Sequence, residues 1–138
     1  MFDSKNVQVA REVSDWRAAI RLAAEPLLAD GSIEPSYVDA MIATVEELGF
    51  YIVLDDDLAM PHARPEAGVH QNAVAFLKLE EACDFGGRPV RLIFVLAAVD
   101  SESHIDKLQL LAELFQDQAR MSELKETDEV SKLVKILN

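Results

Sequence analysis

Cysteine is nearly absent from this chain, because Cys83 is the only one in 138 residues. A single thiol excludes an internal disulfide, and without a second cysteine nearby there is no CxxC metal or redox pair. No apolar run approaches the ~20 residues that a membrane-spanning helix needs. The opening stretch MFDSKNVQVAREVSDW also lacks the basic and apolar regions of a secretory signal. We therefore expect a soluble, cytoplasmic protein.

Positive charge is scarce as well. The 13 Lys and Arg residues stand against 25 Asp and Glu residues, which gives a formal net charge of -12. Affinity for a nucleic-acid backbone depends on clustered Lys and Arg, so we expect no nucleic-acid partner. The acidic residues are spread along the chain, which is typical of a solvated surface or of a surface that meets a basic partner protein. Any phosphate bound here must be held by local positive groups.

The chain has the length and composition of one folded domain, which we expect to span residues 1–138. Half of its residues are hydrophobic. Apolar residues at helical spacing predict helices at residues 15–29, 35–48, 103–116 and 127–137. Alternating or unbroken apolar runs predict strands at residues 7–13, 50–54, 74–79 and 90–99. This order predicts an α/β fold, a single compact layered domain with a mixed β-sheet of about five strands flanked by helices.

Prolines and glycines mark the expected ends of these elements. Pro26 should kink or shorten the first helix. Pro35 is placed to begin the second helix and Gly49 to cap its end, with apolar residues from Tyr37 to Leu48 on the buried face. The segment CDFGGRP supplies a turn between the strands at 74–79 and 90–99.

His104 should lie in the first turn of the helix that follows the strand at 90–99. Ser103 and Asp106 resemble a capping box at the start of that helix, and Ile105 and other apolar residues form its buried stripe. Free backbone N–H groups and the helix dipole at such a place suit an anion and disfavour an imidazolium ion. A neutral His104 could donate one hydrogen bond and accept another. The alternative is a surface histidine without a role near a helix cap.

His62 lies in the segment DLAMPHARPEA, between Pro61 and Pro65. Each proline fixes its own φ and biases the preceding residue toward extended geometry, so we expect a stiff, irregular loop that can aim a side chain. Arg64 follows two residues later and should point to the same side as His62, where a guanidinium group can bind phosphate or carboxylate oxygens. The alternative is an ordinary loop histidine.

Other site chemistries have weaker support. His62, His70 and His104 could be metal ligands, but no H-x-H or H-x-x-x-H spacing occurs and Arg64 would compete with a metal. Serines near His104 lack a G-x-S-x-G elbow, and the glycine pair in CDFGGRP is not a phosphate-binding P-loop. We expect neither a metal nor another cofactor.

The string LAMPHARPEAGV resembles the active-site signature of the enzyme IIA domains of the bacterial phosphoenolpyruvate-dependent sugar phosphotransferase system (PTS). The resemblance is to the mannitol/fructose superfamily (EIIA type 2), and most closely to its ascorbate branch. It extends to DWRAAIRLAAEPLL, VRLIFVLAAVD and SHIDKLQLLAELF, and so covers nearly the whole chain in order. It implies a compact α/β domain in which His62 accepts a phosphoryl group and His104 is the second active-site histidine.

The chain departs from this family at two places. Asp56 and Asp57 stand where relatives commonly have a Pro-Gly pair, so a permissive turn has become acidic. Glu46 and Glu47 occupy the helix that supplies an active-site arginine in mannitol-type relatives. Arg64 is then the best remaining side chain for neutralising a phosphate.

The resemblance also implies a cycle of transfers. The histidine-containing phosphocarrier HPr would phosphorylate His62, and a IIB component that is phosphorylated on cysteine would accept the group and serve a membrane IIC component. Arg64, the ring N–H of His104 and the amides at 103–106 would compensate the phosphoryl charge. A regulatory relative that signals through its phosphohistidine and a module that binds a small anion without covalent chemistry both stay open. The oligomeric state stays open too.

Overall fold

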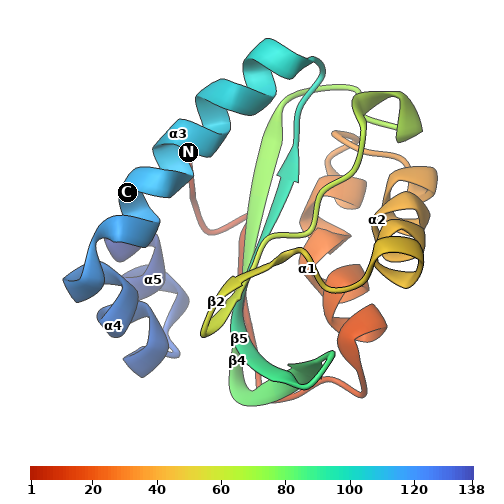
Figure 1. The fold of residues 1–138 in the computed structure, drawn as a ribbon. Coiled ribbons are helices and arrows are strands. Elements are labelled where there is room, and N and C mark those ends of the chain that lie inside the picture. The colour runs from red at the N-terminus through yellow and green to blue at the C-terminus, as the bar shows by residue number, and fades with distance from the viewer.

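A computed structural model describes residues 1–138 as a five-stranded β-sheet between two layers of helices (Figure 1). The predicted α/β class is confirmed. The elements in chain order are β1 (Val7–Ala10), α1 (Trp16–Ala29), α2 (Pro35–Leu48), β2 (Val53–Asp55), β3 (Asp57–Ala59), the 3₁₀ helix η1 (Pro65–Ala67), β4 (Ala73–Phe85), β5 (Arg88–Ala97), α3 (Ser101–Gln116), α4 (Gln118–Glu126) and α5 (Val130–Leu137). None of these helices combines the length and the apolar character that a membrane span requires.

The sheet is mixed, with the strand order β1-β4-β5-β3-β2. β4 and β5 form its antiparallel centre and are joined at the predicted glycine turn, while β1 and β3 each pair in parallel with one of them. The predicted edge strand at 7–13 is β1, which ends earlier, at Ala10. The strands predicted at 74–79 and 90–99 are confirmed as β4 and β5, of which β4 extends much further, to Phe85.

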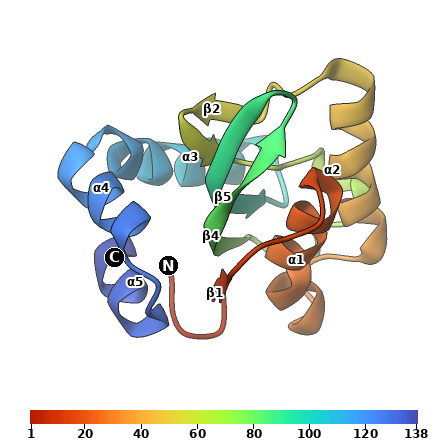
Figure 2. The ribbon, with the colours of Figure 1, turned by 90° about the horizontal axis from the view of Figure 1, so that it is seen from below.

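Helices cover both faces of the sheet, and the view from below shows α1 and α2 on one side and α3, α4 and α5 on the other (Figure 2). Successive residues of β5 alternate between two cores. Ile93 and Val95 pack toward α1 and α2, whereas Leu92 and Phe94 pack toward the C-terminal helices. This alternation explains why the run from Leu92 to Ala97 is wholly apolar, because a strand segment buried on both faces has no position left for a solvated side chain.

Pro26 was expected to kink or shorten the first helix, and it does not shorten it. The helix continues through Pro26 to Ala29. Proline has no N–H to offer the carbonyl group of Leu22 four residues earlier, which usually ends a helix. Here the side chain of Gln8 in β1 donates a hydrogen bond from Nε2 to that oxygen at 2.8 Å. A residue far away in sequence therefore satisfies the acceptor that Pro26 leaves free.

The C-terminal region contains three helices where the sequence predicts two. α3 ends at Gln116, and α4, whose apolar periodicity is weak, was not predicted. The α4 segment is held by Lys78 of β4, whose buried Nζ donates to the carbonyl oxygens of Leu124, Lys125 and Thr127 at 2.8–2.9 Å. Carbonyl groups at the end of a helix lack intrahelical partners, so the ammonium group acts as their cap.

The strand predicted at 50–54 is also corrected. Residues 50–52 form a turn, and β2 and β3 make a tight hairpin through Asp56. Asp57 has a φ of 65°, in the left-handed region that glycine favours, and its carboxylate receives two hydrogen bonds of 3.1 Å from Arg91. This hydrogen bonding by Arg91 lowers the pKa of Asp57. Asp55 and Asp56, which precede it, line a smaller hollow together with residues of α4. None of these three aspartates lines the cleft described below.

Candidate functional site

The largest cleft of the structure is an open depression of about 720 Å³ between α2, the loop after β3 and the first turn of α3. It brings together the three side chains singled out from the sequence, since His62, Arg64 and His104 all line it. His70, the third histidine, lies outside the cleft, where its Nε2 is 3.1 Å from an Oε1 atom of Glu34.

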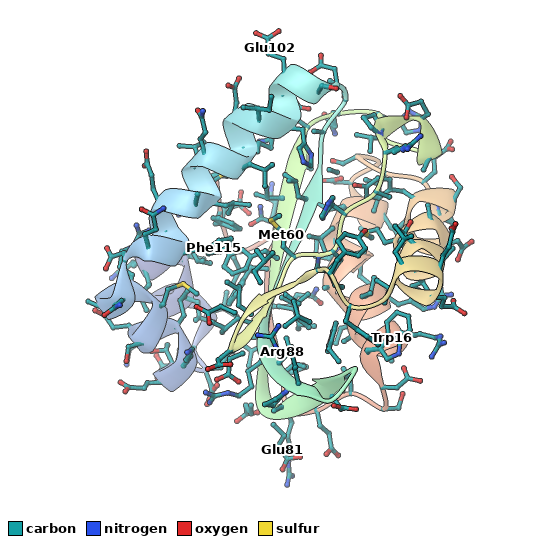
Figure 3. The ribbon with its side chains drawn as sticks, viewed as in Figure 1. Trp16, Met60, Glu81, Arg88, Glu102 and Phe115 are labelled. Atoms are coloured by element: carbon teal, nitrogen blue, oxygen red, sulfur yellow. The ribbon has the colours of Figure 1, made fainter.

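The loop that carries His62 is held by backbone hydrogen bonds on both sides of the histidine. The N–H of Met60 donates to the carbonyl of Ile52 at 2.8 Å, and the carbonyl of Pro61 accepts from the N–H of Leu96 at 3.2 Å. The side chain of Met60 is buried between the sheet and α3 (Figure 3). Tertiary hydrogen bonds therefore restrain this loop in addition to its prolines.

The imidazole ring of His62 has one nitrogen engaged and one free. Nδ1 lies 2.9 Å from the carbonyl oxygen of Met60. A carbonyl oxygen can only accept, so Nδ1 carries the proton and Nε2 keeps its lone pair. Tyr51 packs edge-on against the ring, with centroids 5.7 Å apart and planes at 85°. The half-buried ring is thus oriented on one side, and its Nε2 atom makes no hydrogen bond within the protein.

His104 lies in the first turn of α3, as predicted, but the cap of this helix is Asp100 and not Ser103. The carboxylate of Asp100 accepts a hydrogen bond from the N–H of Ser103 at 2.7 Å, and its carbonyl accepts from the N–H of His104 at 3.1 Å. These two amides are therefore not available to a ligand, contrary to the expectation for residues 103–106. The free end of α3 projects beyond the sheet, with Glu102 in solvent (Figure 3).

Burial and the positive charge of a protonated His62 together lower the pKa of His104. The two rings are close, with centroids 5.6 Å apart. An imidazole held neutral next to His62 has one N–H to donate and one lone pair to accept.

Arg64 is the only lysine or arginine that lines the cleft. Its exposed side chain makes no hydrogen bond or ion pair, and its guanidinium group remains available to an anion. The two glutamates of α2, Glu46 and Glu47, lie in different surroundings. Glu46 pairs with Arg17 at 3.5 Å on the far side of the helix, whereas Glu47 lines the cleft.

The rim of the cleft is apolar and exposed. The exposed fractions are 68% for Leu48, 41% for Tyr51 and 53% for Ile105. Leu48 and Ile105 had been predicted in buried helical stripes, and this prediction is wrong, since both side chains are mostly exposed. Leu48 is the last residue of α2, and Ile105 lies near the start of α3. Tyr51 was missed since it was assigned to a strand. Its position just after the cap Gly49 and close before the P-H motif is the signal that could have found it.

Solved structures of the same architecture define the class of protein. The solution structure of the mannitol-specific cryptic phosphotransferase enzyme IIA CmtB from Escherichia coli has a TM-score of 0.92 at 30% identity, and the match covers 99% of this chain and 94% of that one. The IIA protein in the complex of enzyme IIAMTL and phosphorylated enzyme IIBMTL from Escherichia coli has a TM-score of 0.86 at 27% identity, with coverage of 99% and 96%. The fold is thus that of a phosphotransferase IIA component.

The chain belongs to the family described as the phosphoenolpyruvate-dependent sugar phosphotransferase system, EIIA 2, whose model matches residues 1–138. SgcA of Escherichia coli K12, which is named as a phosphotransferase IIA component, is 34% identical over 123 residues, or 87% of this chain and 86% of SgcA. The ascorbate-specific PTS system EIIA component of Shigella boydii serotype 4 is 32% identical over 127 residues, or 89% of this chain and 82% of that protein. The predicted resemblance is confirmed.

Proposed function

We propose that this chain carries a phosphoryl group on Nε2 of His62. The observation that supports this most directly is the hydrogen bond between Nδ1 of His62 and the carbonyl of Met60, which leaves Nε2 with a free lone pair at an open cleft. A carrier needs such an atom to be both aimed and accessible, because it must meet a donor and an acceptor in turn.

The transfer requires little chemistry from the protein itself. Nε2 of His62 attacks the phosphorus, the N–P bond of the donor phosphohistidine breaks as the new N–P bond forms, and the donor ring keeps the electron pair of the broken bond. Positive charge then develops on the ring of His62, where the carbonyl of Met60 stabilises the proton that stays on Nδ1. No cofactor takes part in this step.

Arg64 and His104 compensate the negative charge of the transferring group. In a loose transition state that charge spreads over three equatorial oxygens, so the protein contributes mainly position and hydrogen-bond donors. Arg64 is the only cationic side chain in the cleft, and a neutral His104 offers one ring N–H beside His62. The carboxylates of Glu47 and Asp100 line the same cleft and repel an anion there. The donors on Arg64 and His104 must offset this repulsion.

The family and the exposed rim support a proposal for the partners. We propose phospho-HPr as the donor, a cysteine-phosphorylated IIB component as the acceptor and a membrane IIC component downstream, with residues 1–138 acting as one cytoplasmic domain. A shallow apolar rim of Leu48, Tyr51 and Ile105 suits transient docking of such partners in turn. The names of the ascorbate-specific relatives support ascorbate as the sugar of the pathway.

The decisive experiment is labelling by phosphoenolpyruvate, enzyme I and HPr. The wild type should acquire an acid-labile, base-stable label, and His62→Ala should acquire none while keeping its far-ultraviolet circular dichroism spectrum. His70→Ala is the matched control, since His70 lies outside the cleft, and it should be labelled at the wild-type rate. A labelled His62→Ala protein contradicts the assignment, and an unlabelled wild type supports a module that binds anions without covalent chemistry.

The acceptor is tested by adding a purified IIB component to the labelled protein. We expect label to pass rapidly to an ascorbate-type IIB and slowly to a mannitol-type IIB. Transfer to the mannitol-type protein alone would contradict the ascorbate assignment. A label that passes to neither would support the regulatory alternative.

A further inference from the structure

Tyr37 of α2 is buried beneath the loop of His62, and its hydroxyl group touches the loop directly. The hydroxyl oxygen accepts a hydrogen bond from the N–H of Ala63 at 3.0 Å. It donates to the carbonyl oxygen of Leu96, at the end of β5, at 2.7 Å. The carbonyl of Ala63 lies further away, at 3.3 Å, and the single hydroxyl proton is better placed for Leu96.

These contacts fix both peptide planes that flank His62. The plane between residues 61 and 62 is held because the carbonyl of Pro61 accepts from the N–H of Leu96. The plane between residues 62 and 63 is held because the N–H of Ala63 donates to Tyr37. The two planes set φ and ψ of His62 and hence the direction of its Cα–Cβ bond. Both hydrogen-bond paths lead to the same residue of β5, since Tyr37 is itself bonded to Leu96.

We propose that Tyr37 is a positioning residue for His62, whose hydroxyl group couples the reactive loop to the end of β5 and so aims Nε2 into the cleft. This inference rests on the proposed function of His62. Tyr37 touches neither the phosphoryl group nor the imidazole ring and acts through the backbone of Ala63. Removing the hydroxyl leaves the N–H of Ala63 without its acceptor, so the peptide plane between residues 62 and 63 is no longer fixed. The orientations of His62 and of the neighbouring Arg64 both depend on that plane.

The hydroxyl group is suited to a permanent contact. Burial raises the pKa of Tyr37 to about 12, although the N–H of Ala63 acts in the opposite direction. The group therefore stays protonated at neutral pH and can donate to Leu96 and accept from Ala63 at the same time. The ring of Tyr37 belongs to the core between the sheet and α2, so phenylalanine can replace it without loss of packing.

The test is Tyr37→Phe, measured by single-turnover transfer from phospho-HPr and by ¹⁵N spectra of the His62 ring. We expect transfer to slow by about 10- to 100-fold, the loss typical of a misplaced reacting group. We also expect the ring of His62 to shift from the Nδ1–H form toward a mixture of tautomers. Wild-type transfer together with an unchanged ring spectrum would overturn the proposal.

Two controls separate positioning from general effects. Ser36→Ala removes a different hydroxyl contact of α2, the 2.7 Å hydrogen bond to the carbonyl of Ala67 in η1, and should transfer at close to the wild-type rate. Leu133→Ala destabilises the opposite core, far from the cleft, and should also transfer normally while folded. If phosphoryl transfer is also slow in Leu133→Ala, the effect of Tyr37→Phe is explained by lost stability and not by positioning.

Hydrogen exchange in the wild type tests the contact without any variant. The N–H of Ala63 lies outside every strand and helix, yet it should be protected because its acceptor is buried. Exchange at the rate of an open loop would overturn the proposal. The exchange and ring spectra do not depend on phosphoryl transfer. An unlabelled wild type with a protected Ala63 would therefore refute the proposed function but not the positioning.

Discussion

The imidazole rings of His62 and His104 lie with centroids 5.6 Å apart and planes inclined at 49°. Two imidazolium ions at this separation would repel each other, so the pair favours states with at most one positive charge. Burial and this repulsion lower the pKa of His104. His104 is thereby suited to assist as a neutral donor, while His62 has the free nitrogen.

Replacing His104 should slow the labelling of His62 without preventing it. The loss of one hydrogen-bond donor to a transition state costs about 3 kcal/mol, or roughly a hundredfold in rate. His104→Ala should therefore be labelled slowly but eventually, and His104→Gln, which keeps a donor, should recover part of the rate. Time courses with mapping of the modified residue check this. Phosphate on His104 in the wild type would show that the two roles are reversed.

The lowered pKa of His104 also has a consequence for stability. As the pH falls through 6.5, the reference value of histidine, the unfolded chain binds a proton that the folded chain resists binding. Unfolding free energy should therefore decrease as the solution is acidified from about pH 7 to pH 5, and less so in His104→Gln. Urea unfolding of both proteins at several pH values measures this difference. Parallel curves would mean that the environment of His104 does not disfavour its charge.

Arg64→Ala should slow transfer and leave the fold intact. The side chain is exposed and unpaired, and its removal costs no packing, whereas the cleft loses its only cation. Arg64→Lys keeps the charge but not the planar fork of donors, and should recover the rate only in part. Quenched-flow transfer from phospho-HPr gives the rates. If Arg64→Ala transfers as fast as the wild type, charge compensation must come from elsewhere.

Lys78→Met should destabilise the protein although the site is untouched. Nζ of Lys78 is buried, binds three carbonyl oxygens and pairs with Asp128 at 3.0 Å. Methionine fills the space but leaves these acceptors at the end of α4 unsatisfied, which should lower the unfolding free energy by about 2–4 kcal/mol. Asp128→Asn removes only the half-exposed partner and should cost less. Equal stability of wild type and Lys78→Met in urea would contradict the capping role.

Asp57 allows backbone strain to be separated from its ion pair. Asp57→Ala and Asp57→Gly both remove the contact with Arg91, but only glycine adopts the observed φ of 65° freely. Asp57→Gly should therefore be more stable than Asp57→Ala by about 1 kcal/mol. Thermal and urea unfolding of the two variants measure the difference. A more stable alanine variant would show that the hairpin relaxes to another conformation when the ion pair is lost.

Much of the fold could be predicted because its signals are local. The period of apolar residues identifies α2, β4 and β5. Pro35 as the first helical residue and Gly49 as the C-cap locate the ends of α2. The β2–β3 hairpin was predicted only in part, as one strand at 50–54, and the weakly periodic α4 was missed. Their formation depends on contacts with Arg91 and Lys78, which no local pattern records.

By itself the sequence determined the α/β class and the family, and it marked His62, Arg64 and His104 as the candidate site residues, because periodicity and short motifs depend only on neighbouring residues. The tertiary structure alone decided that the rings of His62 and His104 meet. It also decided that Tyr37 joins Ala63, 26 residues away, to Leu96, 59 residues away. Such contacts form only when α2 packs against the sheet. Chain folding, and not spacing in sequence, then brings these donors and acceptors within hydrogen-bonding distance.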